Sequence, residues 1–235
     1  MTSWSCSYTL YHSRNFEPRS KKELGDSASV AQNIIYDELP EFERRVLEVL
    51  REPLETGHIT ISRAAHQTDF PASFQLIAAM NPCPCGYRGH PLRACRCTPD
   101  QVERYQARIS GPLLDRIDVQ IEVPTPSQEE LLDGPPGEPT RNVAERVSAA
   151  HARQLARQGK RNALLGGHEI DLHCSRTDAA DGLLRHAMTR FSWSARAYAR
   201  VLKLARTIAD LAGDEQIDAA HVGEAIQYRR GVKAD

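Results

Sequence analysis

The sequence lacks a long apolar run, a secretory signal and an excess of charge of one sign. A membrane-spanning helix needs about 20 consecutive apolar residues, and no stretch of that kind is present. The N-terminus also lacks a positively charged segment followed by an apolar one, so we expect a cytoplasmic protein. A formal net charge of -1 gives no overall attraction to nucleic acid, and any such binding would depend on local basic patches.

A phosphate-binding loop is also missing from the sequence. Such a loop requires Gly, four further residues and then Gly-Lys-Ser/Thr, which places backbone amides and the Lys on the phosphates. The glycine- and proline-rich stretch at 134–140 does not contain this order. At Gly159-Lys160 the position of the first glycine is taken by Gln154. Nucleotide binding through a loop of this kind is therefore not predicted for these residues alone.

The composition is that of a soluble globular protein. The chain has 235 residues, of which 40% are hydrophobic and 26% charged, so it can bury a real core in one or two domains. It has six cysteines, and four of them fall within the segment 83–97. This clustering is typical of a metal site rather than of a secreted disulfide framework.

A short apolar strand, Ile34 to Tyr36, ends in two acidic residues, Asp37 and Glu38. In P-loop ATPases a buried strand delivers an Asp to the Mg²⁺ of the nucleotide. In one branch of these ATPases a Glu follows that Asp and orients the attacking water. The pair suits both roles, although an ordinary strand that ends in a polar turn gives the same pattern.

A second apolar run, Phe74–Met80, predicts a strand buried on both faces and ends at Asn81. A polar side chain at the carboxyl end of a central strand lies where open α/β sheets bind ligands. Asn81 could therefore touch a γ-phosphate or the attacking water, or it could simply initiate a turn before Pro82.

Other local patterns predict the elements around these strands. Apolar spacing predicts a helix from Phe42 that stops near Glu52, because Pro53 disfavours helical geometry in the residue before it. Alternation predicts strands at 58–62 and 119–123, with a turn containing Asp69 and Pro71 after the first. A helix is expected over 100–109.

The four clustered cysteines are Cys83, Cys85, Cys95 and Cys97. Two close pairs of thiolates across a loop suit tetrahedral Zn²⁺, although paired ligands usually have two or more residues between them rather than one. The alternative is a tight loop of reduced cysteines without metal, and His90 could replace one thiol.

Two arginines stand at unusual positions. Arg116 comes just before the predicted strand 119–123, where it is either a surface ion-pair residue or is presented to a phosphate of a neighbouring subunit. Arg196 lies in the first turn of a predicted helix that ends at Gly213, where a cation is mildly disfavoured, so a functional use is suspected.

The second half of the chain has helical periodicity throughout. Its first helix, to about Gln158, carries a basic stripe that we read by default as a solvated face, with phosphate contact as the alternative. The stripe consists of Arg146, Arg153, Arg157 and Lys160. The chain thus divides into an atypical or poorly ordered segment 1–32, an α/β core 33–124, a linker 125–140 and a helical domain 141–235.

Several motifs together resemble one family. They are Asp37-Glu-Leu-Pro-Glu-Phe42, Ala79-Met-Asn-Pro-Cys-Pro-Cys-Gly-Tyr87, Cys95-Arg-Cys97, Ile109-Ser-Gly-Pro-Leu-Leu-Asp-Arg-Ile-Asp118 and Ser194-Ala-Arg-Ala-Tyr198. The resemblance is to the ComM/YifB family, bacterial AAA+ proteins related to the magnesium chelatase ATPase subunit and to minichromosome-maintenance helicases. It covers about 34–230.

The resemblance implies a partial AAA+ P-loop NTPase core followed by an all-α lid. It makes Asp37 and Glu38 the Walker B pair, Asn81 the sensor 1 residue, Arg116 the arginine finger and Arg196 the sensor 2 residue. It further implies ATP and Mg²⁺ as cofactors, a hexameric ring, and ATP-driven branch migration of DNA during natural transformation.

This sequence departs from the family pattern in two ways. Members carry a Lon-protease-like domain and a Walker A loop before the Walker B strand, and the sequence has neither, so it resembles the C-terminal part of such a protein. We therefore expect little or no ATP binding by the chain alone. The alternatives are a motor for metal insertion of the magnesium chelatase type, and a non-enzymatic, zinc-stabilised module that binds nucleic acid or a partner protein.

Overall fold

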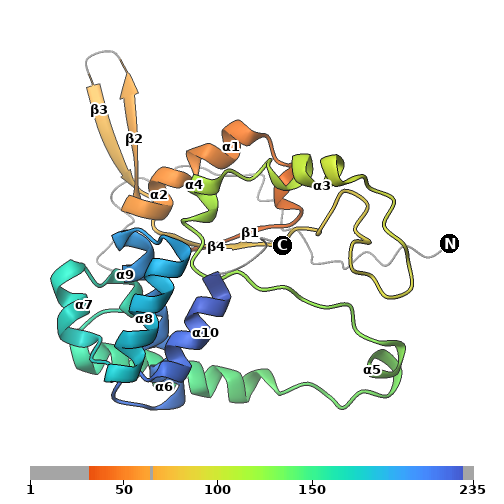
Figure 1. Ribbon diagram of the computed structural model, residues 1–235. Helices are drawn as coiled ribbons and strands as arrows, with labels where there is room; N and C mark the ends of the chain where they lie inside the picture. The colour runs from red at the N-terminus through yellow and green to blue at the C-terminus, as the bar shows by residue number, and fades with distance from the viewer. Residues whose placement is uncertain (1–31, 64–65, 230–235) are drawn as a thin grey trace.

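The computed structural model describes residues 32–63 and 66–229. Figure 1 shows an α/β part with a projecting hairpin, then a long extended connection, then a group of packed helices. The α/β part contains β1 (Gln32–Tyr36), η1 (Leu39–Glu41), α1 (Arg44–Val49), α2 (Arg51–Thr56), β2 (His58–Arg63), β3 (His66–Pro71), β4 (Phe74–Ala78), α3 (Pro99–Gln106) and α4 (Gly111–Leu114).

The helical part begins after a single short helix, α5 (Gln128–Asp133), in the connection. Its packed elements are α6 (Thr140–Gln158), η2 (Asn162–Leu164), α7 (Gly167–His173), α8 (Asp178–Phe191), α9 (Ala195–Ala212) and α10 (Ala219–Arg229). The expected fold class, an α/β core followed by an all-α domain, is thereby confirmed. The loop or tail expected for 1–32 lies, apart from Gln32, outside the described residues.

Strands β1 and β4 pair in parallel, with Tyr36 opposite Ala78. The pairing continues past the strand ends, because the Ala79 N–H donates to the Tyr36 carbonyl and the Leu39 N–H donates to the Ala79 carbonyl, each at 2.9 Å. The carboxyl ends of the two strands therefore stay side by side. The small core beneath them consists of Leu39, Leu47, Ile109 and Leu113.

Two predictions about strands are wrong. β4 is not buried on both faces, because it pairs only with β1 among the described residues and Ile77 remains 45% exposed. The segment 119–123 forms no strand, and Ile121 and Val123 are 64% and 79% exposed. An alternating sequence becomes a strand only where it pairs with another strand, and 119–123 pairs with none among the described residues.

The predictions of a helix end near Glu52 and of a turn around Asp69 are also wrong. The chain stays helical through Pro53, because α2 starts at Arg51 and places Pro53 in its first turn, where a backbone N–H has no partner within the helix. The helix ends instead at Gly57, which has a φ of 73°. The segment around Asp69 is strand β3, antiparallel to β2, and Thr60 donates a hydrogen bond to the Asp69 carboxylate.

The helical part contains the larger core. Helix α9 lies at its centre and packs against α6, α7, α10 and η2. Its apolar face is fully buried at Val201, Leu202, Ala205 and Ala209, as the periodicity predicts. Within the described residues, none of the helices is both long and apolar enough to cross a bilayer.

Candidate functional site

The two acidic residues predicted as a catalytic pair follow β1 directly. Asp37 and Glu38 are both exposed, and the Asp37 carboxylate accepts the Glu38 N–H at 3.0 Å. Glu38 has a φ of 52°, in the left-handed region that residues with a side chain rarely adopt. Strained backbone of this kind is concentrated at functional sites, where the surrounding structure holds it in place. Here the holding contact is the Leu39 N–H on the Ala79 carbonyl.

Asn81 lies at the same end of the sheet, just past β4. Asn81 is exposed, and its backbone faces Tyr105 of α3, where it acts against the burial that raises the pKa of this tyrosine. Gly86 lies close by: a Cβ at that position would be 3.8 Å from the Asn81 amide oxygen, and its φ of 77° disfavours any side chain there. The structure thus brings Asp37, Glu38 and Asn81 to one edge, as parallel strands with adjacent carboxyl ends require.

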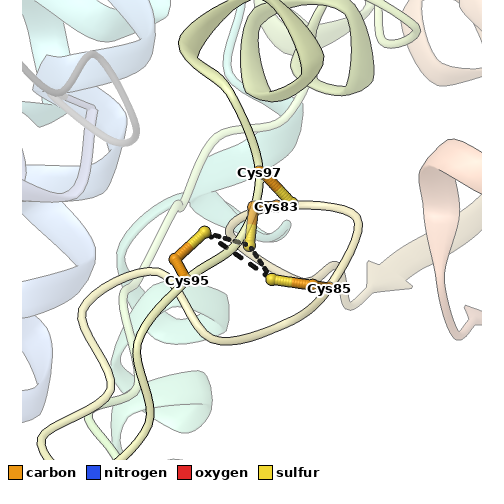
Figure 2. Close-up of side chains that lie close together, drawn as sticks. All are labelled: Cys83, Cys85, Cys95 and Cys97. Carbon is orange, nitrogen blue, oxygen red and sulfur yellow. Dashed lines mark hydrogen bonds between the residues drawn. The ribbon is translucent and has the colours of Figure 1, made fainter.

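The cysteine loop leaves the sheet at Asn81, and its four thiols converge (Figure 2). The Sγ atom of Cys83 lies 3.4 Å from that of Cys85 and 3.7 Å from that of Cys95, and Cys85 and Cys95 are 3.6 Å apart. With Cys97, all four Sγ atoms lie within 4.8 Å of one another. Tetrahedral Zn–S bonds of about 2.3 Å would place sulfurs roughly 3.8 Å apart. Cysteine pairs with only one residue between them therefore do form a cluster of the size that a metal ion requires.

His90 does not belong to this group of four. Its Nδ1 accepts the backbone N–H groups of Leu92 and Arg93 at 3.0 and 3.2 Å, which fixes the turn of the loop. The thiols themselves are electrostatically unlike one another. Backbone hydrogen bonds lower the pKa of Cys85 to about 6, whereas burial raises the pKa of Cys97 to about 12. A bound cation would favour the thiolate form of all four, because metal ligation requires deprotonated sulfur.

The two arginines predicted to contact phosphate meet at a single carboxylate, that of Glu55 on α2. Arg116 Nη2 pairs with Glu55 Oε2, and Arg196 Nη1 pairs with Glu55 Oε1 at 2.5 Å. Arg116 also donates from Nε to the Arg51 carbonyl at 3.0 Å and from Nη1 to the Pro112 carbonyl at 2.6 Å. Hydrogen bonds from Arg196 and Arg116 lower the pKa of Glu55 against the opposing effect of burial.

Sequence reasoning missed two residues of this cluster, Arg200 and the acid Glu55 itself. Arg200 donates from Nη1 to the Arg116 carbonyl at 3.0 Å and to Asp118 at 2.5 Å. The sequence did contain a signal for Arg200, because this residue follows Arg196 by one helical turn and lies on the same helix face. Glu55 gave no such signal, because its partners lie 61 and 141 residues away in the sequence.

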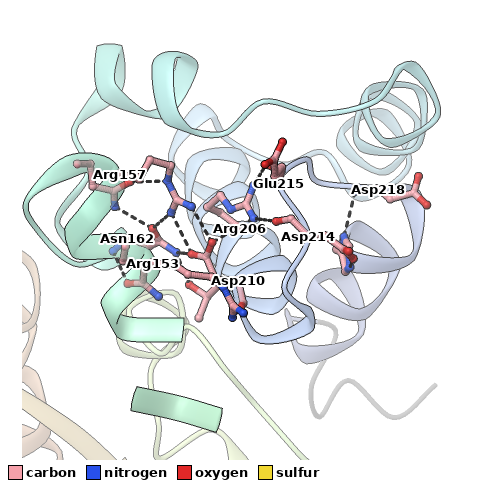
Figure 3. A network of polar contacts seen from close by, with 12 residues as sticks. Arg153, Arg157, Asn162, Arg206, Asp210, Asp214, Glu215 and Asp218 are labelled. Carbon is pink, nitrogen blue, oxygen red and sulfur yellow. Dashed lines mark hydrogen bonds and ion pairs between the residues drawn. The ribbon is translucent and has the colours of Figure 1, made fainter. Parts of the chain in front are cut away.

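The basic stripe is in part the expected solvated face, since Arg146 and Arg153 are exposed, but its cations have partners within the chain. Arg157 binds the buried Asp210 carboxylate through both of its terminal nitrogens, and Arg153 donates to the Asp210 carbonyl at 2.7 Å (Figure 3). Arg146 pairs with Glu138 and Lys160 with Glu169. All four cations are used within the chain.

The candidate residues therefore form two groups. One is the acidic edge of the sheet, with Asp37, Glu38 and Asn81. The other is the arginine group on Glu55, and among the described residues neither Arg116 nor Arg196 is ion-paired with an acid of that edge.

Two family models match the chain, and both describe the same magnesium chelatase subunit. The model for magnesium chelatase, subunit ChlI, matches residues 21–131. The model for the C-terminal part of the same subunit matches residues 137–229. Together they cover the acidic edge, the cysteine loop and both arginines.

Similar curated proteins come from several bacteria. Competence protein ComM of Haemophilus influenzae is 47% identical over 209 residues, which are 87% of this chain and 40% of the relative. The uncharacterized protein YifB of Escherichia coli is 46% identical over 206 residues, which are 86% and 40%. An uncharacterized protein of Mycobacterium tuberculosis is 35% identical over 203 residues, which are 84% and 39%. The chain spans about 40% of the length of these relatives.

Proposed function

Because the chain belongs to the magnesium chelatase-like ComM/YifB family, we propose that it carries the hydrolytic half of an AAA+ ATP site. Its α/β part is a partial AAA+ core, and its helical part is the all-α domain that follows. The proposal covers the catalytic acids, the sensor asparagine and the arginines. The phosphate-binding loop is not among these 235 residues.

The observation that carries the proposal is the meeting of Asp37, Glu38 and Asn81 at one edge of a parallel sheet. In this arrangement Asp37 would hold the Mg²⁺ of ATP, Glu38 would orient and deprotonate the attacking water, and Asn81 would position that water. The metal supplies neutralisation of charge on the phosphates when it is bound. The unusual φ of Glu38 supports its role, because that backbone sets the direction of the carboxylate.

The arginines complete the site from a second copy of the chain. Arg116 acts as the arginine finger and Arg196 as the sensor 2 residue. Their joint position on Glu55, away from the acids of their own chain, supports action in trans. A ring of subunits provides this geometry, and a hexamer is the assembly proposed for the full-length protein.

The cysteine cluster is a structural zinc site. Four Cys ligands close the coordination sphere and leave no open position for catalysis. The loop runs from Asn81 to α3, whose Gln106 side chain donates to the Pro82 carbonyl at 3.3 Å. Zinc therefore stiffens the segment that holds the sensor asparagine.

The substrate of the motor is DNA. This proposal is supported by the 47% sequence identity with the competence protein of Haemophilus influenzae. The proposed task is ATP-driven branch migration during natural transformation. A metal-insertion motor is the second candidate, favoured by the description of the matching family models. A non-enzymatic zinc-stabilised module that completes an ATP site in trans is the third.

The test uses the Haemophilus influenzae relative with the substitution equivalent to Glu38→Gln. We expect unchanged ATP binding, because Asp37 and the phosphate loop remain, and loss of steady-state hydrolysis by a factor of about 100 or more. The substitution equivalent to Glu52→Gln, an exposed acid on α2, is the matched control. Hydrolysis that survives in the Glu38 variant would overturn the catalytic assignment.

A further inference from the structure

One carboxylate holds two arginines that come from distant parts of the chain. Each oxygen of Glu55 takes one guanidinium, Arg116 on Oε2 and Arg196 on Oε1. Arg116 is only 14% exposed, whereas Arg196 and Glu55 are 41% and 39% exposed. Glu55, Arg116 and Arg196 therefore form a partly exposed cluster, called the clamp below, in which two guanidinium groups bind one carboxylate.

Positive charge exceeds negative charge around this clamp. Arg200 lies directly behind Arg116 and is paired with Asp118. Arg229 packs into the same region, where burial and the nearby Arg200 and Arg196 lower its pKa against the effect of Asp118 and Asp115. Its Nη1 is buried without a hydrogen-bond partner in the described part of the chain. A buried guanidinium nitrogen without a partner is costly, so the region is short of an acceptor.

We propose that Glu55 is a placeholder for a phosphate group. It holds Arg116 and Arg196 as a preformed pair while the site is empty, and it is displaced when the terminal phosphate of a nucleoside triphosphate on a neighbouring copy enters the clamp. This inference rests on the proposed trans action of the arginines. It adds a positioning residue, Glu55, that also lowers the affinity of the empty site for anions.

The chemistry favours such an exchange. A carboxylate carries one negative charge and two acceptor oxygens, whereas a terminal phosphate carries more charge and three oxygens, and arginine binds both through paired N–H donors. The phosphate must outcompete an internal ligand, so its apparent affinity is reduced by the fraction of molecules in which Glu55 occupies the clamp. Removal of the Glu55 charge should remove this penalty.

The experiment measures binding of inorganic tripolyphosphate to the full chain by titration calorimetry at fixed ionic strength. Because the clamp is half exposed, we expect Glu55→Gln to bind about fivefold more tightly than the wild type. Glu48→Gln is the matched control, since it removes an equal charge nearby that pairs with Arg51 instead. It should leave the affinity within about twofold of the wild type. The double variant Glu55→Gln/Arg116→Ala should lose the gain.

Three results would overturn the proposal. They are no tighter binding by Glu55→Gln, an equal gain in Glu48→Gln, and a gain that survives Arg116→Ala. Circular dichroism of each variant verifies that the fold is retained, and Glu55→Asp, which keeps the charge but shortens the side chain, should fall between the wild type and Glu55→Gln. A fivefold gain in this chain, combined with full ATP hydrolysis by an Arg116-deficient relative, would keep the clamp as an anion site and reject only its catalytic use.

Discussion

Replacement of Asp210 by Asn should destabilise the helical part more than any single surface change. Asp210 is 1% exposed and accepts three hydrogen bonds, two from Arg157 at 2.7 and 3.0 Å and one from Asn162 at 2.8 Å. The fully buried Arg206 lies 3.1 Å from the same carboxylate. Asp210→Asn keeps the shape of the side chain but removes the charge that both guanidinium groups face.

The magnitude follows from the burial of the pair. Removal of one partner of a buried ion pair costs about 3–5 kcal/mol, because the remaining charge is left uncompensated. Arg157 is 26% exposed, and Arg206 still donates to the carbonyls of Asp214 and Glu215, so part of the loss is offset. We expect a loss of about 3 kcal/mol in the free energy of unfolding, a large share of the about 5–15 kcal/mol typical of a domain.

Urea unfolding followed by far-UV circular dichroism measures this loss. Asp214→Asn is the control, because its carboxylate is 58% exposed and pairs only with His221 among the described residues. Its effect should stay within about 0.5 kcal/mol of zero. A loss below about 1 kcal/mol for Asp210→Asn would refute the reasoning, since it would mean that the buried charges are compensated in another way.

The same substitution has a pH dependence of known sign. Burial raises the pKa of Asp210, but the hydrogen bonds from Arg157 and Asn162 outweigh it and lower the pKa below its ordinary value. The stabilisation is therefore fully present above the unfolded-state pKa and is lost as the pH falls through the lower folded-state pKa. The stability difference between the wild type and Asp210→Asn should narrow in acid, and a difference that widens would contradict this assignment.

Two further predictions concern bound groups. Metal analysis of the purified chain should find one zinc per molecule, lost in Cys83→Ser/Cys97→Ser and retained in Cys174→Ser, whose thiol is buried elsewhere; equal zinc in both variants would rule out the site. Titration calorimetry with ATP should show at most weak binding by the chain, because the phosphate-binding loop is not among its residues; micromolar affinity would contradict this expectation.

The features that could be predicted from the sequence are those determined by residues close together in the chain. The acids after β1, Asn81 after β4 and the cysteine pairs all depend on short-range order, and the four cysteines converge as a metal site requires. The end of α9 at Gly213 depends on turn chemistry, which is equally local.

The remaining features depend on contacts between distant segments. Alternation at 119–123 favoured a strand, but whether a strand forms depends on a partner edge that no local pattern reports. The ion pair of Arg157 depends on Asp210, which lies 53 residues away in the sequence. The clamp on Glu55 joins α2, the segment after α4 and the start of α9, so no window of sequence contains it.

The most direct measurement of the central claim is a mixing experiment in the full-length Haemophilus influenzae relative. The protein with the substitution equivalent to Arg116→Ala should hydrolyse ATP at least about a thousandfold more slowly than the wild type. The protein with the substitution equivalent to Glu38→Gln should be slower by a factor of about 100 or more. Their mixture should regain part of the activity, because mixed rings contain interfaces that pair an intact Glu with an intact Arg. If the Arg116 variant alone forms rings and keeps wild-type turnover, the assignment of Arg116 as a finger acting in trans is wrong.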